Sequence, residues 1–269
     1  MDIRVYNPMR PMRFNRGHMP WYIPQEGERD LRFSRDQLAL YIILVYEANG
    51  YGLVTYKLKD LKKIWGSAEI DIATCLRSLC SRRGMDDSYE IEFIGDDLET
   101  ALRSPESRLM LRIRNVGLYT KTKGFFTISE DVLWKIALLC DRRNYAALIQ
   151  LYAYMASRMQ SFTYLDGRSQ ETQNAKCFWR SHADICNDLN LQNRTLRRYI
   201  KCLENAEAIT YCHGSYRKDA PEDQQWSLFV EGVADEIVMA AALNHRENYR
   251  RKKYSSSGAG LFRSRKGPC

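Results

Sequence analysis

The chain has 269 residues, of which 45% are hydrophobic, so it is long enough to bury one large core or two small ones without disulfide or metal staples. Its formal net charge of +8 favours an anionic partner, although net charge alone does not distinguish nucleic acid, membrane and protein. The longest apolar runs, such as 38–46, are far shorter than the ~20 residues that cross a bilayer, so a membrane-spanning protein is not expected.

The excess positive charge lies at the two ends of the chain. Residues 246–269 carry eight basic side chains against one acidic one, and residues 1–16 carry four Arg against one Asp. The remaining body therefore has a net charge of −2. This distribution predicts flexible basic arms that neutralise phosphates without recognising sequence.

Cysteine usage indicates a reducing compartment. The eight Cys mostly fall in apolar-periodic stretches, no signal peptide precedes them, and no pair has the CxxC spacing. We therefore expect reduced, buried thiols in a cytoplasmic protein, with disulfides as the less favoured alternative. These residues are Cys75, Cys80, Cys140, Cys177, Cys186, Cys202, Cys212 and Cys269.

The first half of the chain predicts three helices followed by two strands. Residues 1–27 show no helical period and are interpreted as an extended arm or a strand added to another element. Ser34 is a plausible N-cap for the first helix, and Asn49 and Gly50 end that helix. The order is typical of a winged helix. The predicted elements are helices 38–47, 55–65 and 67–83, then antiparallel strands 89–94 and 109–113 joined by a long loop.

A comparable order returns in the second half. Adding 124 to the residue number aligns five apolar positions of the central helices without gaps, for example Leu76 with Ile200 and Leu79 with Leu203. We interpret this as an internal duplication, with chance similarity between two helical hairpins as the alternative. The predicted elements are strand 125–128, a helix from 129, helix 142–159, a polar loop 161–176, helix 181–189, a turn 190–192, helix 193–205, strands 209–212 and 226–230, helix 234–253 and a flexible linker 255–260.

The most informative segment is 182–209, HADICNDLNLQNRTLRRYIKCLENAEAI. In its second helix, apolar residues such as Leu196 and Ile200 are spaced to face the core, and polar and basic residues lie on the other faces. In a helix-turn-helix, such a helix enters the major groove, where Arg bonds guanine and Asn bonds adenine. The structural alternative is a solvated basic face on an ordinary helical hairpin. The predicted base contacts are Asn193, Arg194 and Arg197, with Thr195 on the same face, and the predicted backbone contacts are Arg198 and Lys201.

The run from 145 to 209 resembles the winged-helix proteins of bacterial plasmids, integrative elements and phages. It has an apolar long helix, a variable loop, a small helix, the TLRRYIKCLE helix and an Ala-Ile step into a strand. These families include replication initiators with tandem winged helices and accessory regulators. The resemblance implies DNA binding through 193–201 and through a wing at 213–218, which holds Arg217 and Lys218.

The first half differs from the second in charge. Its corresponding helix offers Glu69, Asp71, Thr74 and Arg77, and the segment 86–99 contains seven acidic residues and no basic one. Such a surface repels phosphate. The segment is either the charged solvent face of an edge strand or a surface that contacts protein. In the second case, the partner is another copy of the chain or a basic protein of a replication or transcription complex.

The sequence carries no pattern that predicts catalysis. There is no Gly-rich phosphate loop with its lysine, and the four His form neither HxH nor HExxH. Cys212 beside His213 is interpreted as a partly buried thiol and a DNA-proximal imidazole. The 17 Tyr leave Tyr-dependent DNA cleavage open, but no Tyr lies in a marked basic cluster, and Tyr199 is expected to pack. We therefore expect a non-enzymatic protein with no metal and no cofactor.

Together these observations predict an α+β protein that is mainly α-helical, with small β-wings in two winged-helix units. Four parts are expected: an arm at 1–30, a first unit at 31–122, a DNA-reading unit at 123–232, and a C-terminal helix with a basic tail at 233–269. The tail is expected to add backbone contacts through Arg250, Arg251, Lys252 and Lys253.

The predicted function is sequence-specific binding of double-stranded DNA by a replication initiator or accessory protein of a mobile element. The alternatives are a transcriptional regulator, which would more often be a symmetric dimer on a palindrome, and an adaptor that binds no DNA.

Overall fold

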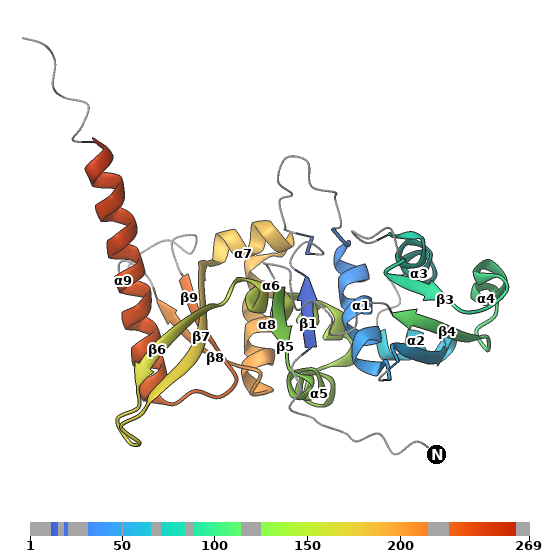
Figure 1. Ribbon diagram of the computed structural model, residues 1–269, viewed down its shortest axis with the longest axis horizontal. Coiled ribbons are helices and arrows are strands. Elements are labelled where there is room, and N and C mark those ends of the chain that lie inside the picture. The colour runs from blue at the N-terminus through green and yellow to red at the C-terminus, as the bar shows by residue number, and fades with distance from the viewer. Residues whose placement is uncertain are drawn as a thin grey trace, which may run out of the picture. The chain divides into compact units, whose positions relative to one another are not determined.

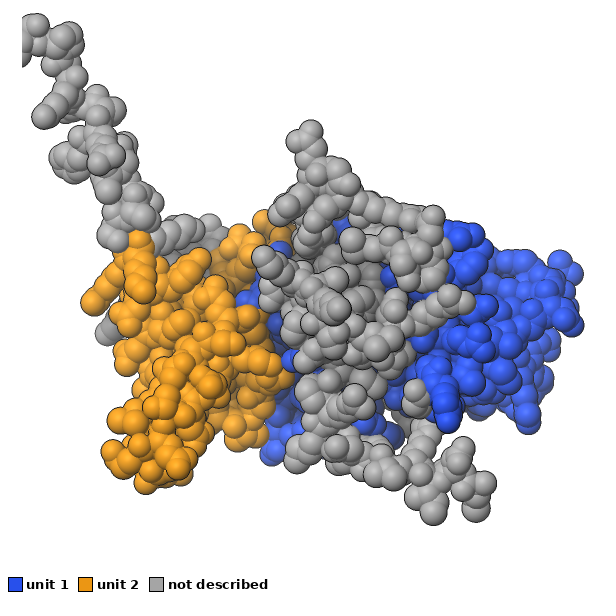
Figure 2. Space-filling view, in the orientation of Figure 1, with its two compact units in different colours: residues 1–158, 194–208 blue, residues 159–193, 209–269 orange. Residues whose placement is uncertain are grey.

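The computed structural model describes residues 12–15, 19–20, 32–49, 51–65, 71–83, 89–113, 125–214 and 226–261. The chain divides into two compact units, the first formed by 1–158 and 194–208 and the second by 159–193 and 209–269 (Figure 2). This division differs from the predicted four parts, since residues 125–158 and the helix 193–205, all expected in the DNA-reading unit, belong almost entirely to the first compact unit. The fold is α+β with small antiparallel sheets, as expected (Figure 1).

The first half forms a three-stranded antiparallel sheet in the order β2-β4-β3, together with four helices. The elements are α1 (Arg35–Glu47), β2 (Leu53–Lys57), α2 (Leu58–Trp65), α3 (Ile72–Ser81), β3 (Ile91–Phe93), α4 (Leu98–Arg103) and β4 (Arg108–Ile113).

Helix α1 begins and ends on signals present in the sequence. The side chain of Ser34 accepts from the backbone of Gln37 while the Gln37 side chain accepts from the backbone N–H of Ser34, which forms a capping box. After the helix, the Asn49 side chain accepts from the N–H groups of Tyr51 and Leu53. Residues 38–45 are all buried, so α1 is a core helix. The predicted N-cap at Ser34 is confirmed.

Two expectations for the first half are wrong. Residues 55–57 are predicted to open a helix, but they pair with β4, Thr55 lying opposite Met110. Thr and Tyr in LVTYK favour a strand, and β4 supplies the hydrogen-bonding partner. The expected long loop between β3 and β4 contains α4, because the carboxylate of Asp97 accepts from the N–H groups of Glu99 and Thr100 and caps a short helix.

The N-terminal segment contributes a strand to the first unit. Strand β1 (Met12–Asn15) pairs antiparallel with β5 (Phe125–Ile128), with Phe14 opposite Phe126. Phe14 is buried, and its ring lies 6.3 Å from that of Tyr41 and 5.6 Å from that of Phe126. Of the two interpretations of 1–27, the added strand is therefore confirmed for residues 12–15.

The rest of the first unit is helical. Helix α6 is apolar on all sides, and its buried residues run almost without interruption from Ala146 to Ser157. It packs against α1, and Gln150 donates to Asp36 of α1 over 3.3 Å. The elements are α5 (Glu130–Leu139), a 3-10 turn (Arg142–Asn144), α6 (Tyr145–Arg158) and α8 (Asn193–Asn205).

The second unit is a four-stranded antiparallel sheet in the order β6-β7-β9-β8, packed against a long helix. Core residues such as Phe162, Leu228 and Ala242 join the sheet to that helix. The elements are β6 (Gln160–Leu165), β7 (Thr172–Ser181), α7 (His182–Leu189), β8 (Ile209–Gly214), β9 (Trp226–Glu231) and α9 (Glu236–Leu261).

The predicted polar loop at 161–176 is wrong, since most of it forms the β6–β7 hairpin. Its polar residues face each other across the strands: Thr163 donates to Asn174 over 2.9 Å. The Asp166 side chain accepts from the N–H of Arg168 and organises the turn. From β6, Phe162 is buried and Tyr164 packs partly buried against the same core, so the apolar alternation is limited to two residues in a segment that is otherwise mostly polar.

The predicted flexible linker at 255–260 is also wrong, because α9 continues to Leu261. Extending an existing helix costs much less than nucleating one, so a polar Ser-rich run can follow α9 as helix. The anchored part of α9 lies against β6, β7 and β9, where the His245 ring stacks at 5.5 Å on Phe162 (Figure 1). Among the described residues, no helix has the length and apolar character that crossing a bilayer requires.

The same order of elements occurs twice along the chain. Helix α1, β2, α2, α3, β3 and β4 are matched in order by α6, β7, α7, α8, β8 and β9. In each set the first and last strands pair, and the middle strand lies outside the last: β2-β4-β3 and β7-β9-β8. The second set draws on both compact units.

The cysteines in the described residues are all free thiols. Burial raises the pKa of Cys75 to about 11. Burial and the nearby thiol of Cys202 raise the pKa of Cys140 to about 11 as well. Burial also raises the pKa of Cys80 and Cys177 to about 12. Because the thiolate is the reactive species, these four should react with iodoacetamide at neutral to mildly basic pH about 100-fold more slowly in the native protein than in denaturant. Mass spectrometry of labelled peptides measures this, and equal rates in both states would contradict it.

Candidate nucleic-acid interface

Helix α7 is fixed to the sheet of the second unit by polar contacts. Arg180 on β7 lies 3.7 Å from the carboxylate of Asp184 and 3.4 Å from that of Asp188, both on α7. The side chain of Ser181 accepts from the N–H of Asp184 over 3.0 Å and caps the helix. These contacts tie the start and the middle of α7 to the end of β7.

A buried histidine links α7 to two further strands. His182 is 2% exposed, and its Nε2 lies 2.5 Å from the hydroxyl of Ser227 on β9. Its ring centroid is 5.3 Å from that of His213 on β8. His213, expected near DNA, is exposed and lies beside His182, while Cys212 is half-buried as expected. The sequence pattern did not indicate the role of His182.

The turn after α7 depends on one left-handed residue. Asn190 has φ 50° and ψ 51°, and its N–H donates to the carbonyls of Asn187 and Cys186. The next N–H, that of Leu191, donates to Cys186 over 2.9 Å. Asn tolerates this conformation better than other residues with a Cβ, and Gly adopts it freely. The predicted turn at 190–192 is confirmed, and Asn190 stops α7 so that α8 can begin at Asn193.

Asn190→Val is expected to destabilise the protein by roughly 1–2 kcal/mol, because a β-branched residue is strained at this positive φ. Asn190→Gly is the matched control and should retain the stability of the parent within about 0.5 kcal/mol. Urea unfolding of the three proteins measures the difference. If the Val variant is as stable as the Gly variant, the left-handed turn is not what stops α7.

Helix α8 separates an apolar side from a basic side. Leu196, Ile200 and Leu203 are buried, as the spacing predicts, and Tyr199 is 8% exposed, which fits its expected packing role. Asn193 and Thr195 are half-buried at the start of the helix. Four basic side chains are exposed along it: Arg194, Arg197, Arg198 and Lys201.

Two of the basic residues of α8 have partners on the same helix. Lys201 lies 2.9 Å from the carboxylate of Glu204, and the guanidinium of Arg198 lies 5.3 Å from the centroid of the Tyr199 ring. An exposed pair three residues apart is weak and is easily exchanged for a phosphate. The helix ends where Glu207 adopts a left-handed conformation and the N–H of Ala208 donates to Leu203. The predicted bounds of this helix, 193–205, are confirmed.

The hairpin after α8 is confirmed as far as it is described. Strands β8 and β9 pair from Ile209 opposite Glu231 to Gly214 opposite Trp226. The two predicted wing residues, Arg217 and Lys218, lie outside the described residues. Their predicted contact with DNA stays a prediction.

Five of the eight basic residues near the C-terminus, from Arg246 to Lys253, lie on α9, as the predicted helix 234–253 implies, and the other three lie outside the described residues. Arg251 and Lys252 are exposed, and Arg250 lies 4.0 Å from Glu247. Lys253 belongs to the helix, but its side chain lies outside the described part. Arg246, which belongs to the basic end of the sequence, is 5% exposed and stacks 3.5 Å over the centre of the Trp226 ring, so it is a structural residue.

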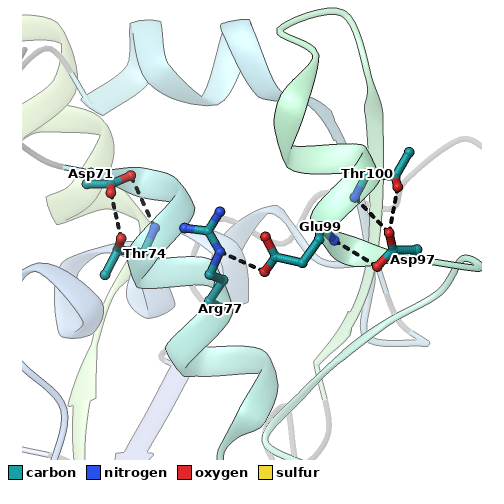
Figure 3. A network of polar contacts seen from close by, with 6 residues as sticks. All are labelled: Asp71, Thr74, Arg77, Asp97, Glu99 and Thr100. Atoms are coloured by element: carbon teal, nitrogen blue, oxygen red, sulfur yellow. Dashed lines mark hydrogen bonds and ion pairs between the residues drawn. The ribbon is translucent and has the colours of Figure 1, made fainter.

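The acidic segment 86–99 of the first half fits the expected charged face of an edge strand only in part. Glu92 lies at the edge strand β3 and pairs with Arg112 at 3.4 Å, which fits the edge-strand interpretation. Glu90, expected on the solvent face, is 4% exposed. Asp97 caps α4, and Glu99 faces Arg77 on α3 (Figure 3). Asp86 and Asp87 lie outside the described residues.

Neither a family model nor a curated protein matches the chain. One solved structure that it resembles is the crystal structure of Pi initiator protein in complex with iteron DNA. The match has a TM-score of 0.40 and 14% sequence identity, and it covers 86% of this chain and all of the other. A likeness this distant says nothing by itself about function. Among the described residues, no three His, Cys, Asp or Glu side chains gather in a way that could hold a metal ion.

Proposed function

We propose that this chain binds duplex DNA sequence-specifically through α8. The observation that carries the proposal is the exposure of Arg194, Arg197, Arg198 and Lys201 on a helix whose opposite side is buried. Arg194 and Arg197 contact guanine edges, and Asn193 contacts adenine beside the half-buried Thr195. Arg198 and Lys201 hold phosphates, with Lys201 exchanging Glu204 for the DNA backbone.

The repeated order of elements supports two winged helices as the framework of this function. A winged helix places its second and third helices between the first strand and a hairpin, and both halves of the chain follow that order. In this scheme α8 is the recognition helix of the second winged helix, and α3 is the corresponding helix of the first. The basic residues of α9 add backbone contacts.

We infer a role as a non-enzymatic replication initiator or accessory replication protein of a mobile element. An initiator recruits a helicase or its loader, and the acidic segment 86–99 of the first half offers a surface for such a partner while α8 holds the DNA. A transcriptional regulator would use α8 in the same way but on a palindrome, in two copies. The alternative from a different functional class is a protein-interaction adaptor that does not bind DNA.

Footprinting on the DNA that flanks the chain's own gene tests this role. An initiator is expected to protect several direct repeats, whereas a regulator would protect one palindrome next to a promoter. Measurements should be made at about 150 mM salt, since lower salt increases binding that depends on charge alone. Protection of no site, together with failure to bind any duplex, would overturn the proposed function in favour of an adaptor.

A further inference from the structure

Helices α3 and α8 hold equivalent places in the two repeated sets, yet they present different surfaces. The offset of 124 residues places Arg77 of α3 at the position of Lys201, and both side chains are exposed. At the positions of Arg197 and Arg198, α3 has Ala73 and Thr74. The side chains that would recognise bases are therefore absent from α3, and Arg77 is its one exposed basic residue between Ile72 and Ser81.

Arg77 is held by a residue of the β3–β4 connection. In a winged helix this connection is the wing, and here it contains the short helix α4. Asp97 caps α4 and thereby fixes its first turn, which carries Glu99. The carboxylate of Glu99 accepts a hydrogen bond of 2.7 Å from Nε of Arg77 (Figure 3). The same bond lowers the pKa of Glu99 and raises the pKa of Arg77, so both groups stay charged at neutral pH.

We propose that Glu99 binds the Arg77 side chain where a DNA phosphate would otherwise bind. This ion pair keeps the first half of the chain from binding DNA. A carboxylate and a phosphate oxygen use the same guanidinium donors, so Glu99 competes with an incoming phosphate. Glu99 differs from Glu204, the partner of Lys201, because it comes from another helix whose first turn is fixed by the Asp97 cap. Asp71, at the start of α3, adds a second negative charge there, and its carboxylate accepts from the N–H and hydroxyl of Thr74. The inference rests on the proposed DNA binding and assigns the recognition of bases to α8 alone.

The test compares Glu99→Gln with the parent chain on a labelled duplex of about three helical turns and arbitrary sequence. Gln cannot neutralise Arg77, so the variant should bind about 3- to 10-fold more tightly at about 100 mM salt. Its plot of log Kd against log salt should steepen by about 1, because one more phosphate is neutralised. The double variant R77Q/E99Q has the same net charge as the parent but no cation at position 77, so it should return to near the parent value.

The controls separate this inference from the proposed function. Since an exposed ion pair contributes little to stability, all variants should unfold at the temperature of the parent. Binding by the parent chain tests the proposed function, whereas the difference between parent and E99Q tests the inference. An unchanged affinity and salt slope in E99Q would overturn the inference, as would a full gain in R77Q/E99Q.

Discussion

Replacing Arg194 and Arg197 with Ala is expected to abolish sequence preference while leaving the fold intact. Both side chains are exposed on α8, and the buried side of the helix does not change. Removing each guanine contact should cost about 1–3 kcal/mol of discrimination between the preferred duplex and a scrambled one. Competition binding with the two duplexes measures this difference directly.

A matched control removes the same charge from exposed residues outside α8. Arg103 on α4 and Arg108 on β4 serve for this, since both are exposed and lie in the first half. The double variant R103A/R108A should retain sequence preference. If R194A/R197A retains it as well, α8 is not the helix that recognises the bases. If both variants lose it, charge rather than base contact explains the preference.

Replacing Arg250, Arg251, Lys252 and Lys253 with Gln should weaken binding to all duplexes alike. Gln is a good helix former, so α9 should persist without these charges. If all four residues contact phosphates, the slope of log Kd against log salt should fall by about 3 to 4, and the ratio between preferred and scrambled duplex should stay constant. Titrations from low to high salt with both duplexes measure the two quantities together.

Substitution is preferable to truncation at this end of the chain. Tyr249 lies with its ring 5.6 Å from that of Trp179, and Arg246 stacks on Trp226, so a truncation at these residues would also remove packing contacts. Substitution leaves both contacts in place. A change in sequence preference in the four-Gln variant would mean that α9 reaches bases, and an unchanged salt slope would mean that it does not touch DNA.

The parts of the fold that depend on local signals were predictable. Helix α8 has the predicted bounds because its apolar residues follow the helical period from Leu196 to Leu203 and a turn residue, Asn190, precedes it. The capping box at Ser34 is likewise a contact between residues three apart in sequence. The burial of Leu196, Ile200 and Leu203 was predictable for the same reason, since periodicity decides which side of a helix faces the core.

The missed parts depend on contacts between distant residues. The β6–β7 hairpin is held by cross-strand pairs such as Thr163 with Asn174, and the polar run 166–174 between its few core residues is typical of a loop. The burial of Arg246 requires Trp226 on another element, and the neutralisation of Arg77 requires Glu99, 22 residues later. Local pattern cannot indicate such partners, so these residues were assigned from charge alone.

Selection of bound duplexes from a random library at about 150 mM salt tests the central proposal most directly, because that salt suppresses binding by charge alone. The parent chain and the four-Gln variant of α9 should be selected in parallel. Our account predicts that both enrich the same motif, the variant more weakly. Failure of both proteins to enrich any motif would contradict sequence-specific binding through α8 and would favour the adaptor.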